Sequence, residues 1–209
     1  MGYKGFLGVG AIILTFIAFY PYIRGILRGR IKPHVLSWVI WAITTFVVFL
    51  AQLADNGGAG AWPIGVSGVI TGYVAIAAFL KRSDTAVTKA DWAFFSMAAL
   101  ALPFWYFTAD PLWAVVILTT VDVLGFGPTF RKAYFLPFEE HLTFFALFTV
   151  RNGIAMMALE HYSLTTLLFP GVTGIACLGL IAMVLYRRRK LKAIVNLESI
   201  STRPPIPRP

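Results

Sequence analysis

Charge is scarce in this 209-residue sequence, in which only 13% of residues are Asp, Glu, Lys or Arg. Soluble domains carry about a quarter charged residues, so this chain lacks the polar surface that water requires. Hydrophobic residues make up 58% of it instead. At about 20 apolar residues per crossing, these suffice for six or seven transmembrane helices and leave no room for a soluble catalytic domain. We therefore expect an all-α integral membrane protein.

Cysteine and clustered catalytic residues are also scarce. The single cysteine, Cys177, excludes an internal disulfide bond. Glu139, Glu140 and His141 are consecutive and so do not share one helix face, which argues against a metal site. The hydrophobic segments hold no nucleophile with a neighbouring base, and the last has no lysine that could carry retinal. We expect no metal, no cofactor and no enzymatic activity.

Seven hydrophobic segments separated by short polar links predict seven transmembrane helices. Clusters of Gly, Asp and Asn, an Asp-Pro pair and pairs of basic residues mark the links. The predicted helices span residues 6–27, 35–54, 62–80, 92–107, 112–130, 142–159 and 164–186.

The basic residues predict the orientation of these helices. Sixteen of the 18 Lys and Arg residues fall at residues 24–32, 81–89 and 131–132 and in the tail after residue 186. By the positive-inside rule, the N-terminus lies outside and the C-terminus in the cytoplasm of a multi-pass protein of the cell (inner) membrane. The excess of basic over acidic residues then indicates orientation and attraction to anionic lipid head groups, so nucleic acid is not an expected partner.

An internal repeat relates the two ends of the chain at a constant offset of 107 residues. The stretch AFYPYIRGILRGRIKPH, at residues 18–34, aligns with GFGPTFRKAYFLPFEEH at 125–141. The offset continues through the third predicted helix and predicts two parallel three-helix copies joined by a linker helix. The identities are Phe19 with Phe126, Pro21 with Pro128, Arg24 with Arg131, His34 with His141, Pro63 with Pro170 and Gly72 with Gly179. The predicted organisation is a first repeat at 1–82, the linker at 83–109, a second repeat at 110–189 and a disordered cytoplasmic tail at 190–209.

This 3+1+3 layout, with a proline near the cytoplasmic end of the first helix of each copy, resembles the PQ-loop superfamily, which includes the SWEET transporters. The stretches PHVLSWVIWAI and VDVLGFGPTFRKAYFLPFEE resemble a bacterial branch of it. The resemblance implies that Pro21 and Pro128 are hinges that let the cytoplasmic helix halves flex. In this chain Tyr22 and Thr129 replace the glutamine of the PQ pair.

Two ionisable residues fall inside the predicted helices, Asp122 and Arg151. At 1.5 Å per residue, both lie near the middle of a hydrocarbon core of about 30 Å. A lone charge at that depth costs several kcal/mol, so we expect the two to form an ion pair or to face a water-filled cavity. In one version Arg151 binds an anionic group of a substrate and Asp122 exchanges a proton. In others the pair is only a gate or a structural lock between two helices.

Matching stripes on the second and sixth predicted helices complete the candidate site. Trp38, Trp41 and Thr45 are spaced three and four apart and share one helix face. Their repeat equivalents are Phe145, Phe148 and Asn152, and such stripes also occur as packing surfaces. The predicted substrate path consists of Asp122, Arg151, Asn152, Trp41, Thr45, Trp38 and Phe148.

These patterns favour a transporter of a small polar solute that works by alternating access, with proton coupling left open. The alternative is a non-transporting seven-helix receptor or assembly factor, because the KDEL receptor is similar at the level of fold. A single chain holds both copies and so contains a complete path, whereas association into a homo-oligomer stays open.

Overall fold

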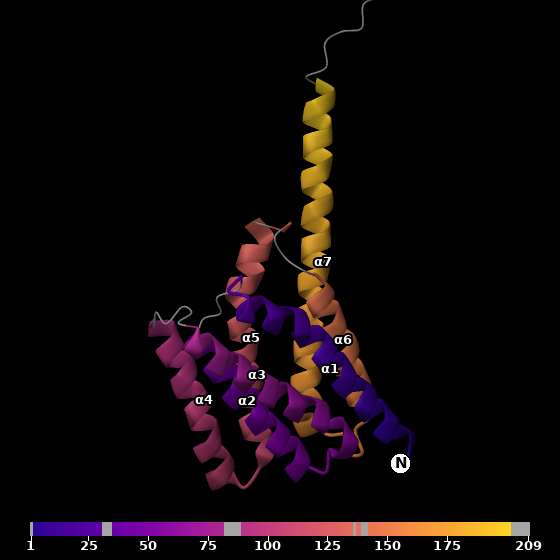
Figure 1. Ribbon diagram of the computed structural model, residues 1–209. Coiled ribbons are helices and arrows are strands. Elements are labelled where there is room, and N and C mark those ends of the chain that lie inside the picture. Colours follow the sequence, from indigo (N-terminus) through magenta and orange to yellow (C-terminus); the bar gives the residue numbers. More distant parts are fainter. Residues whose placement is uncertain (1, 31–34, 82–88, 136, 139–141, 202–209) are drawn as a thin grey trace, which may run out of the picture.

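The computed structural model describes residues 2–30, 35–81, 89–135, 137–138 and 142–201, and all regular structure in these ranges is helical (Figure 1). The all-α prediction is therefore confirmed for this part of the chain. The elements are α1 (Tyr3–Leu27), α2 (Val35–Ala54), the short 3-10 helix η1 (Gly58–Gly60), α3 (Trp62–Leu80), α4 (Lys89–Thr108), α5 (Pro111–Phe135), α6 (Leu142–Met157) and α7 (Leu164–Ser201).

The helix boundaries follow from local sequence chemistry. At the end of α1, Gly29 adopts a φ of +69°, a left-handed conformation that favours glycine and stops the helix. Pro63 occupies the first turn of α3, where its missing N–H costs nothing. Asp110 precedes α5, and its side chain accepts a hydrogen bond from the Leu112 N–H at 2.9 Å. Short polar links between long apolar helices therefore produce a bundle.

Three helices are long and apolar enough to cross a membrane, at Tyr3–Leu27, Gly58–Leu80 and Leu164–Ala193. Each has at least the roughly 20 residues that a hydrocarbon core of about 30 Å demands. Many of their large apolar side chains are exposed, as expected of a surface that faces lipid. The shorter apolar helices are Trp38–Ala54, Phe95–Thr108, Pro111–Phe126 and Leu142–Met157.

Helix packing has the same order at the two ends of the chain. Within the first half, α3 packs against both α1 and α2; within the second, α7 packs against both α5 and α6. The halves then join crosswise, because α1 packs on α6 and α2 packs on α5. These six helices form a closed circuit of contacts, and α4 packs outside it on α2 and α5.

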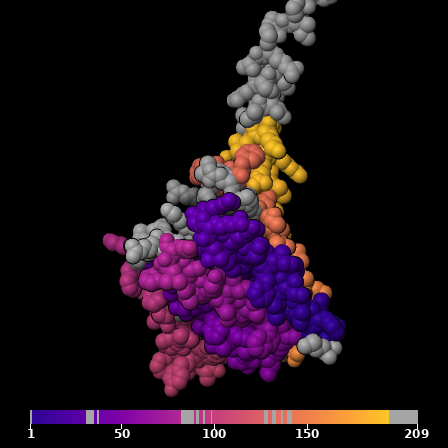
Figure 2. All heavy atoms as spheres, in the orientation of Figure 1, coloured from indigo at the N-terminus to yellow at the C-terminus, as the bar shows by residue number. Residues whose placement is uncertain are grey.

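The last helix is longer than predicted. The prediction of a helix end near residue 186 and a disordered tail from 190 is wrong in the described part of the chain, because α7 continues without a break to Ser201 (Figure 1). The physical reason is that residues 187–201 contain good helix formers such as Arg, Lys, Leu and Ala, with no Gly or Pro. In Figure 2 the end of α7 stands clear of the packed body.

Candidate functional site

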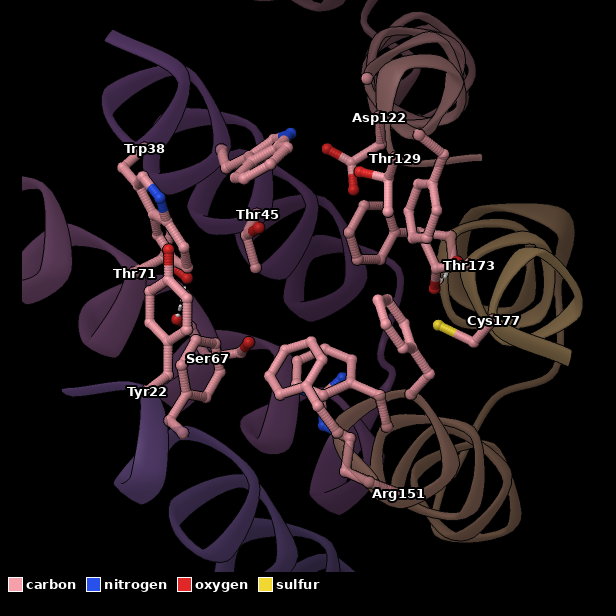
Figure 3. Close-up of a pocket in the computed structure, with 18 residues that line it drawn as sticks. Tyr22, Trp38, Thr45, Ser67, Thr71, Asp122, Thr129, Arg151, Thr173 and Cys177 are labelled. Carbon is pink, nitrogen blue, oxygen red and sulfur yellow. Dashed lines mark hydrogen bonds between the residues drawn. The ribbon is translucent and has the colours of Figure 1, made fainter. Parts of the chain in front are cut away.

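A cavity of about 430 Å³ lies inside the circuit of six helices, within the range of small-molecule sites (Figure 3). Side chains from α1, α2, α3, α5, α6 and α7 line it, and α4 contributes none of the described lining residues. The lining residues are Phe19, Tyr22, Trp38, Trp41, Thr45, Ser67, Thr71, Asp122, Gly125, Phe126, Thr129, Phe144, Phe145, Phe148, Arg151, Phe169, Thr173 and Cys177.

The cavity is nearer to one end of the bundle. On α1 it is lined by Phe19 and Tyr22, which lie towards the helix C-terminus, and on α2 by Trp38 and Trp41, which lie near the N-terminus. Both positions adjoin the link that joins these helices. That link is one of the four basic regions of the sequence, so the cavity occupies the basic half of the bundle.

Half of the eighteen lining residues are aromatic, and their rings contact one another. The rings of Phe19 and Phe148 meet edge to face with centroids 5.5 Å apart, which joins α1 to α6. Trp38 lies 5.4 Å from Trp41 and 5.0 Å from Tyr22, measured between ring centroids. Such contacts restrict the ring rotamers, so the apolar wall is preorganised.

Arg151 is almost fully enclosed, with 1% of its surface exposed. Its Nε donates to Thr15 Oγ1 at 3.1 Å, its Nη1 to Asn152 Oδ1 at 2.6 Å, and its Nη2 to the Pro63 carbonyl oxygen. Its guanidinium carbon lies 5.2 Å from the centre of the Phe148 ring. The side chain therefore ties α6 to α1 and α3 through protein oxygens.

Asp122 lies on α5, is half-buried and faces the cavity (Figure 3). Its Oδ1 accepts a hydrogen bond from Thr44 Oγ1 at 3.3 Å. The predicted ion pair with Arg151 is wrong: the structure places both residues on one cavity, but neither forms a salt bridge in the described part of the chain. Each charge is held instead by a threonine from the other half of the bundle.

The two charge-bearing hydrogen bonds are equivalent under the sequence repeat. Thr44 and Arg151 are 107 residues apart, as are Thr15 and Asp122. The α2–α5 bond from Thr44 to Asp122 therefore corresponds to the α6–α1 bond from Arg151 to Thr15. The physical reason for the missing ion pair is this pairing, in which each charge meets the threonine that is equivalent to the other charge.

The same offset relates much of the cavity wall. In four pairs of positions 107 residues apart, both members line the cavity, although the side chains differ in three of them. The cavity is thus built from equivalent places in the two halves of the chain. These pairs are Phe19 with Phe126, Tyr22 with Thr129, Trp38 with Phe145, and Trp41 with Phe148.

Comparisons with known proteins assign this geometry to no family. No protein-family model, curated protein or solved structure matches the chain. The described residues also hold no group of three or more His, Cys, Asp or Glu that could bind a metal ion. The interpretation of the site therefore rests on its own chemistry.

The structure places six of the seven predicted path residues on the cavity wall. The seventh, Asn152, lies behind the wall, where it accepts from Arg151 and donates from Nδ2 to Thr173 Oγ1 at 3.0 Å. Of the predicted hinges, Pro21 lies inside α1 with an exposed side chain. Pro128 lies within α5, and its side chain is outside the described residues.

Sequence reasoning missed the contribution of α3 and α7 to the cavity. Ser67 and Thr71 come from α3, and Phe169, Thr173 and Cys177 from α7. These positions follow from the packing of each third helix between its two partners, which hydropathy does not reveal. The repeat did contain a usable signal for Phe19 and Phe126, because their identity marks equivalent places at equal depth.

The opposite end of the bundle is closed by contacts between the two halves. Gln52 Nε2 donates to the Thr166 carbonyl at 2.8 Å, and Lys4 Nζ to the Leu159 carbonyl at 2.6 Å. A Cβ built on Gly60 would lie 2.5 Å from the Ala155 carbonyl oxygen, so backbones meet here at a distance that only glycine permits. A cavity near one end and close packing at the other make the site asymmetric along the bundle.

Proposed function

We propose that this chain is a membrane transporter of a small polar solute, built from two parallel three-helix repeats joined by α4. The observation that carries the proposal is the shared cavity: all six repeat helices line it, and α4 stays outside. Sites formed at the interface of internal repeats are typical of secondary transporters.

The repeat equivalences support a PQ-loop and SWEET-like 3+1+3 architecture. Equal packing order within each half, crosswise packing between the halves and the two equivalent hydrogen bonds are all expected for parallel repeats about an axis along the membrane normal. In this arrangement α1 to α7 are seven crossings of the cell membrane. The N-terminus is outside and the basic links and tail face the cytoplasm and its anionic lipid head groups.

Alternating access follows from the asymmetry of the bundle. The cavity lies in the half that the basic links assign to the cytoplasm, and the other half is closed by contacts between repeats. Opening the outer end requires these contacts to break while the basic end closes. Pro21 and Pro128 are the proposed hinges, because each removes an N–H donor from the helix at the cytoplasmic side of the cavity.

Asp122 is the proposed coupling residue of the transporter. It carries a charge beside the path and is held by one hydrogen bond, so it can exchange a proton with a solute or with water. Arg151 is assigned a different part, because its bonds to Thr15, Asn152 and Pro63 make it a cross-link between repeats.

Flux through reconstituted protein tests the proposal. Purified chain in liposomes with an imposed pH gradient is screened for uptake of labelled small solutes, and Asp122→Asn and Arg151→Ala are then compared with wild type. The matched control is Asp110→Asn, which removes a carboxylate from an exposed turn. Unchanged flux and unchanged pH dependence in both cavity variants would refute the mechanism.

A receptor or assembly factor of the same fold is the second candidate. The cross-link at Arg151 and the closed outer end are also features that a binding protein without transport would have. Saturable binding together with an absence of flux, in liposomes that contain correctly folded protein, would favour this candidate over the transporter.

A further inference from the structure

We propose that the solute bound in the cavity is an organic cation with an aromatic or similarly flat apolar body, whose positive group binds the carboxylate of Asp122. The inference rests on the proposed function, because it names the class of solute for the same cavity. It is carried by the difference between the two charged groups of the wall and by the rings between them.

Asp122 is the charge that a ligand can reach. Its side chain is half-buried and turned to the cavity, and Thr44 is its hydrogen-bond partner in the described structure. An ionised carboxylate accepts about four hydrogen bonds, so most of its capacity is open towards the cavity. A ligand that donates N–H groups or carries positive charge satisfies this capacity.

Arg151 does not offer the converse site for an anion. It is 1% exposed, and its three nitrogens already donate to Thr15, Asn152 and Pro63. Figure 3 shows Asp122 and Arg151 on opposite sides of the view, with aromatic side chains between them. An anionic ligand would have to displace bonds that hold α6 to α1 and α3, whereas a cation at Asp122 displaces only water.

The aromatic wall favours a cation over an anion. Nine of the eighteen lining residues are Phe, Tyr or Trp. Ring faces are negative, so they attract ammonium groups and stack with flat bodies, and they repel anions. Trp41 lies beside Gly125 on α5, one turn from Asp122, so the carboxylate and the tryptophan form one corner of the cavity.

The hydroxyl groups of the wall add acceptors. Thr71 Oγ1 donates to the Ser67 carbonyl at 2.7 Å, and Thr173 Oγ1 donates to the Phe169 carbonyl at 2.7 Å. A hydroxyl whose proton is engaged in its own helix presents lone pairs to its other side. The wall therefore has a surplus of acceptors, which suits the N–H donors of an amine.

Three probes that share one ring separate the charge classes. Phenethylamine is a cation, 2-phenylethanol is neutral and phenylacetate is an anion at pH 7. Their binding is measured by isothermal titration calorimetry on the full chain in nanodiscs, with empty nanodiscs as the background. We expect phenethylamine to bind most tightly and phenylacetate most weakly. Equal affinities, no binding of phenethylamine, or tighter binding of phenylacetate would overturn the inference.

Substitution of the carboxylate gives the second arm. Asp122→Asn should weaken phenethylamine binding by about tenfold or more, because a charge-assisted hydrogen bond is lost. It should leave 2-phenylethanol binding within about twofold, which also shows that the cavity is folded. Asp122→Glu should retain the preference for the amine, and the control Asp110→Asn should bind all three probes as wild type does. An unchanged affinity of Asp122→Asn for phenethylamine would refute the role of this residue.

Binding and flux fail separately. Amine-selective binding that depends on Asp122, without uptake of labelled phenethylamine into liposomes, supports the inference and refutes the transporter. Uptake of other solutes with no amine-selective binding supports the transporter and refutes the inference.

Discussion

Loss of the Thr15 hydroxyl should destabilise this protein far more than loss of an ordinary threonine hydroxyl. Thr15→Val keeps the shape of the side chain and removes the oxygen that accepts from Arg151 Nε at 3.1 Å. Thr15 is fully buried and Arg151 is 1% exposed, so water cannot replace the lost acceptor. A buried donor left without a partner costs about 1–3 kcal/mol, with the upper part of the range expected for a charged group.

The equivalent change in the other repeat should cost less. Thr44→Val removes the donor to Asp122, but that bond is 3.3 Å long and Asp122 faces a cavity that water can enter. We expect a loss below about 1 kcal/mol. The repeat therefore predicts where the two bonds are, and burial predicts that their energies differ.

The free energy of unfolding is measured in detergent micelles by denaturant titration, with tryptophan fluorescence as the signal. Thr120→Val is the control, because the Thr120 hydroxyl is exposed and donates within its own helix to Val116. It should change stability by no more than about 0.5 kcal/mol. In an Arg151→Met background, Thr15→Val should lose most of its effect, with a coupling energy of about 1 kcal/mol or more.

Two results would refute this reasoning. One is a Thr15→Val variant as stable as Thr120→Val, which would mean that the bond to Arg151 contributes nothing. The other is an additive double variant with Arg151→Met, which would mean that the cost of Thr15→Val arises from packing.

Three further substitutions test the closed end, a buried hydroxyl and the cavity corner. Gly60→Ala should destabilise by about 1–3 kcal/mol in the same titration, because its Cβ would meet the neighbouring backbone at 2.5 Å, whereas Gly153→Ala, with nothing within 4 Å, should be neutral or stabilising; equal effects would contradict the close packing. Thr119→Val should stabilise by about 1 kcal/mol, since its buried hydroxyl has no partner in the described structure, and a loss of stability would show that it has one. Gly125→Ala places a Cβ 3.2 Å from Trp41 Nε1, so calorimetry should find severalfold weaker phenethylamine binding at unchanged thermal stability, and unchanged binding would move the ligand away from this corner.

Helix positions were predictable where apolar runs end at strong local signals. The bounds of Val35–Ala54 and Trp62–Leu80 agree with the predicted ranges, because Asp-Asn-Gly-Gly and a first-turn proline separate these helices. The end of α7 was not predictable in the same way. Hydropathy stops at the basic run, but helix propensity does not, so the helix outlasts its apolar part.

The candidate site was predictable in membership but only partly in geometry. Asp122 and Arg151 were selected because charges are rare in apolar helices, and the structure places both on one cavity. Their partners depend on which helices touch, and the crosswise packing of α1 on α6 and α2 on α5 offers each charge a threonine. Sequence periodicity contains no information about contacts between segments that are far apart in the chain.

The unbroken course of α7 gives the cavity a mechanical extension. The helix includes Phe169, Thr173 and Cys177 of the wall and runs on to Ser201, beyond the rest of the bundle. From Cys177 to Ser201 it rises about 36 Å at 1.5 Å per residue. A tilt of about 5° at the cavity would then displace the far end by about 3 Å, so α7 acts as a lever that magnifies small movements around a bound solute.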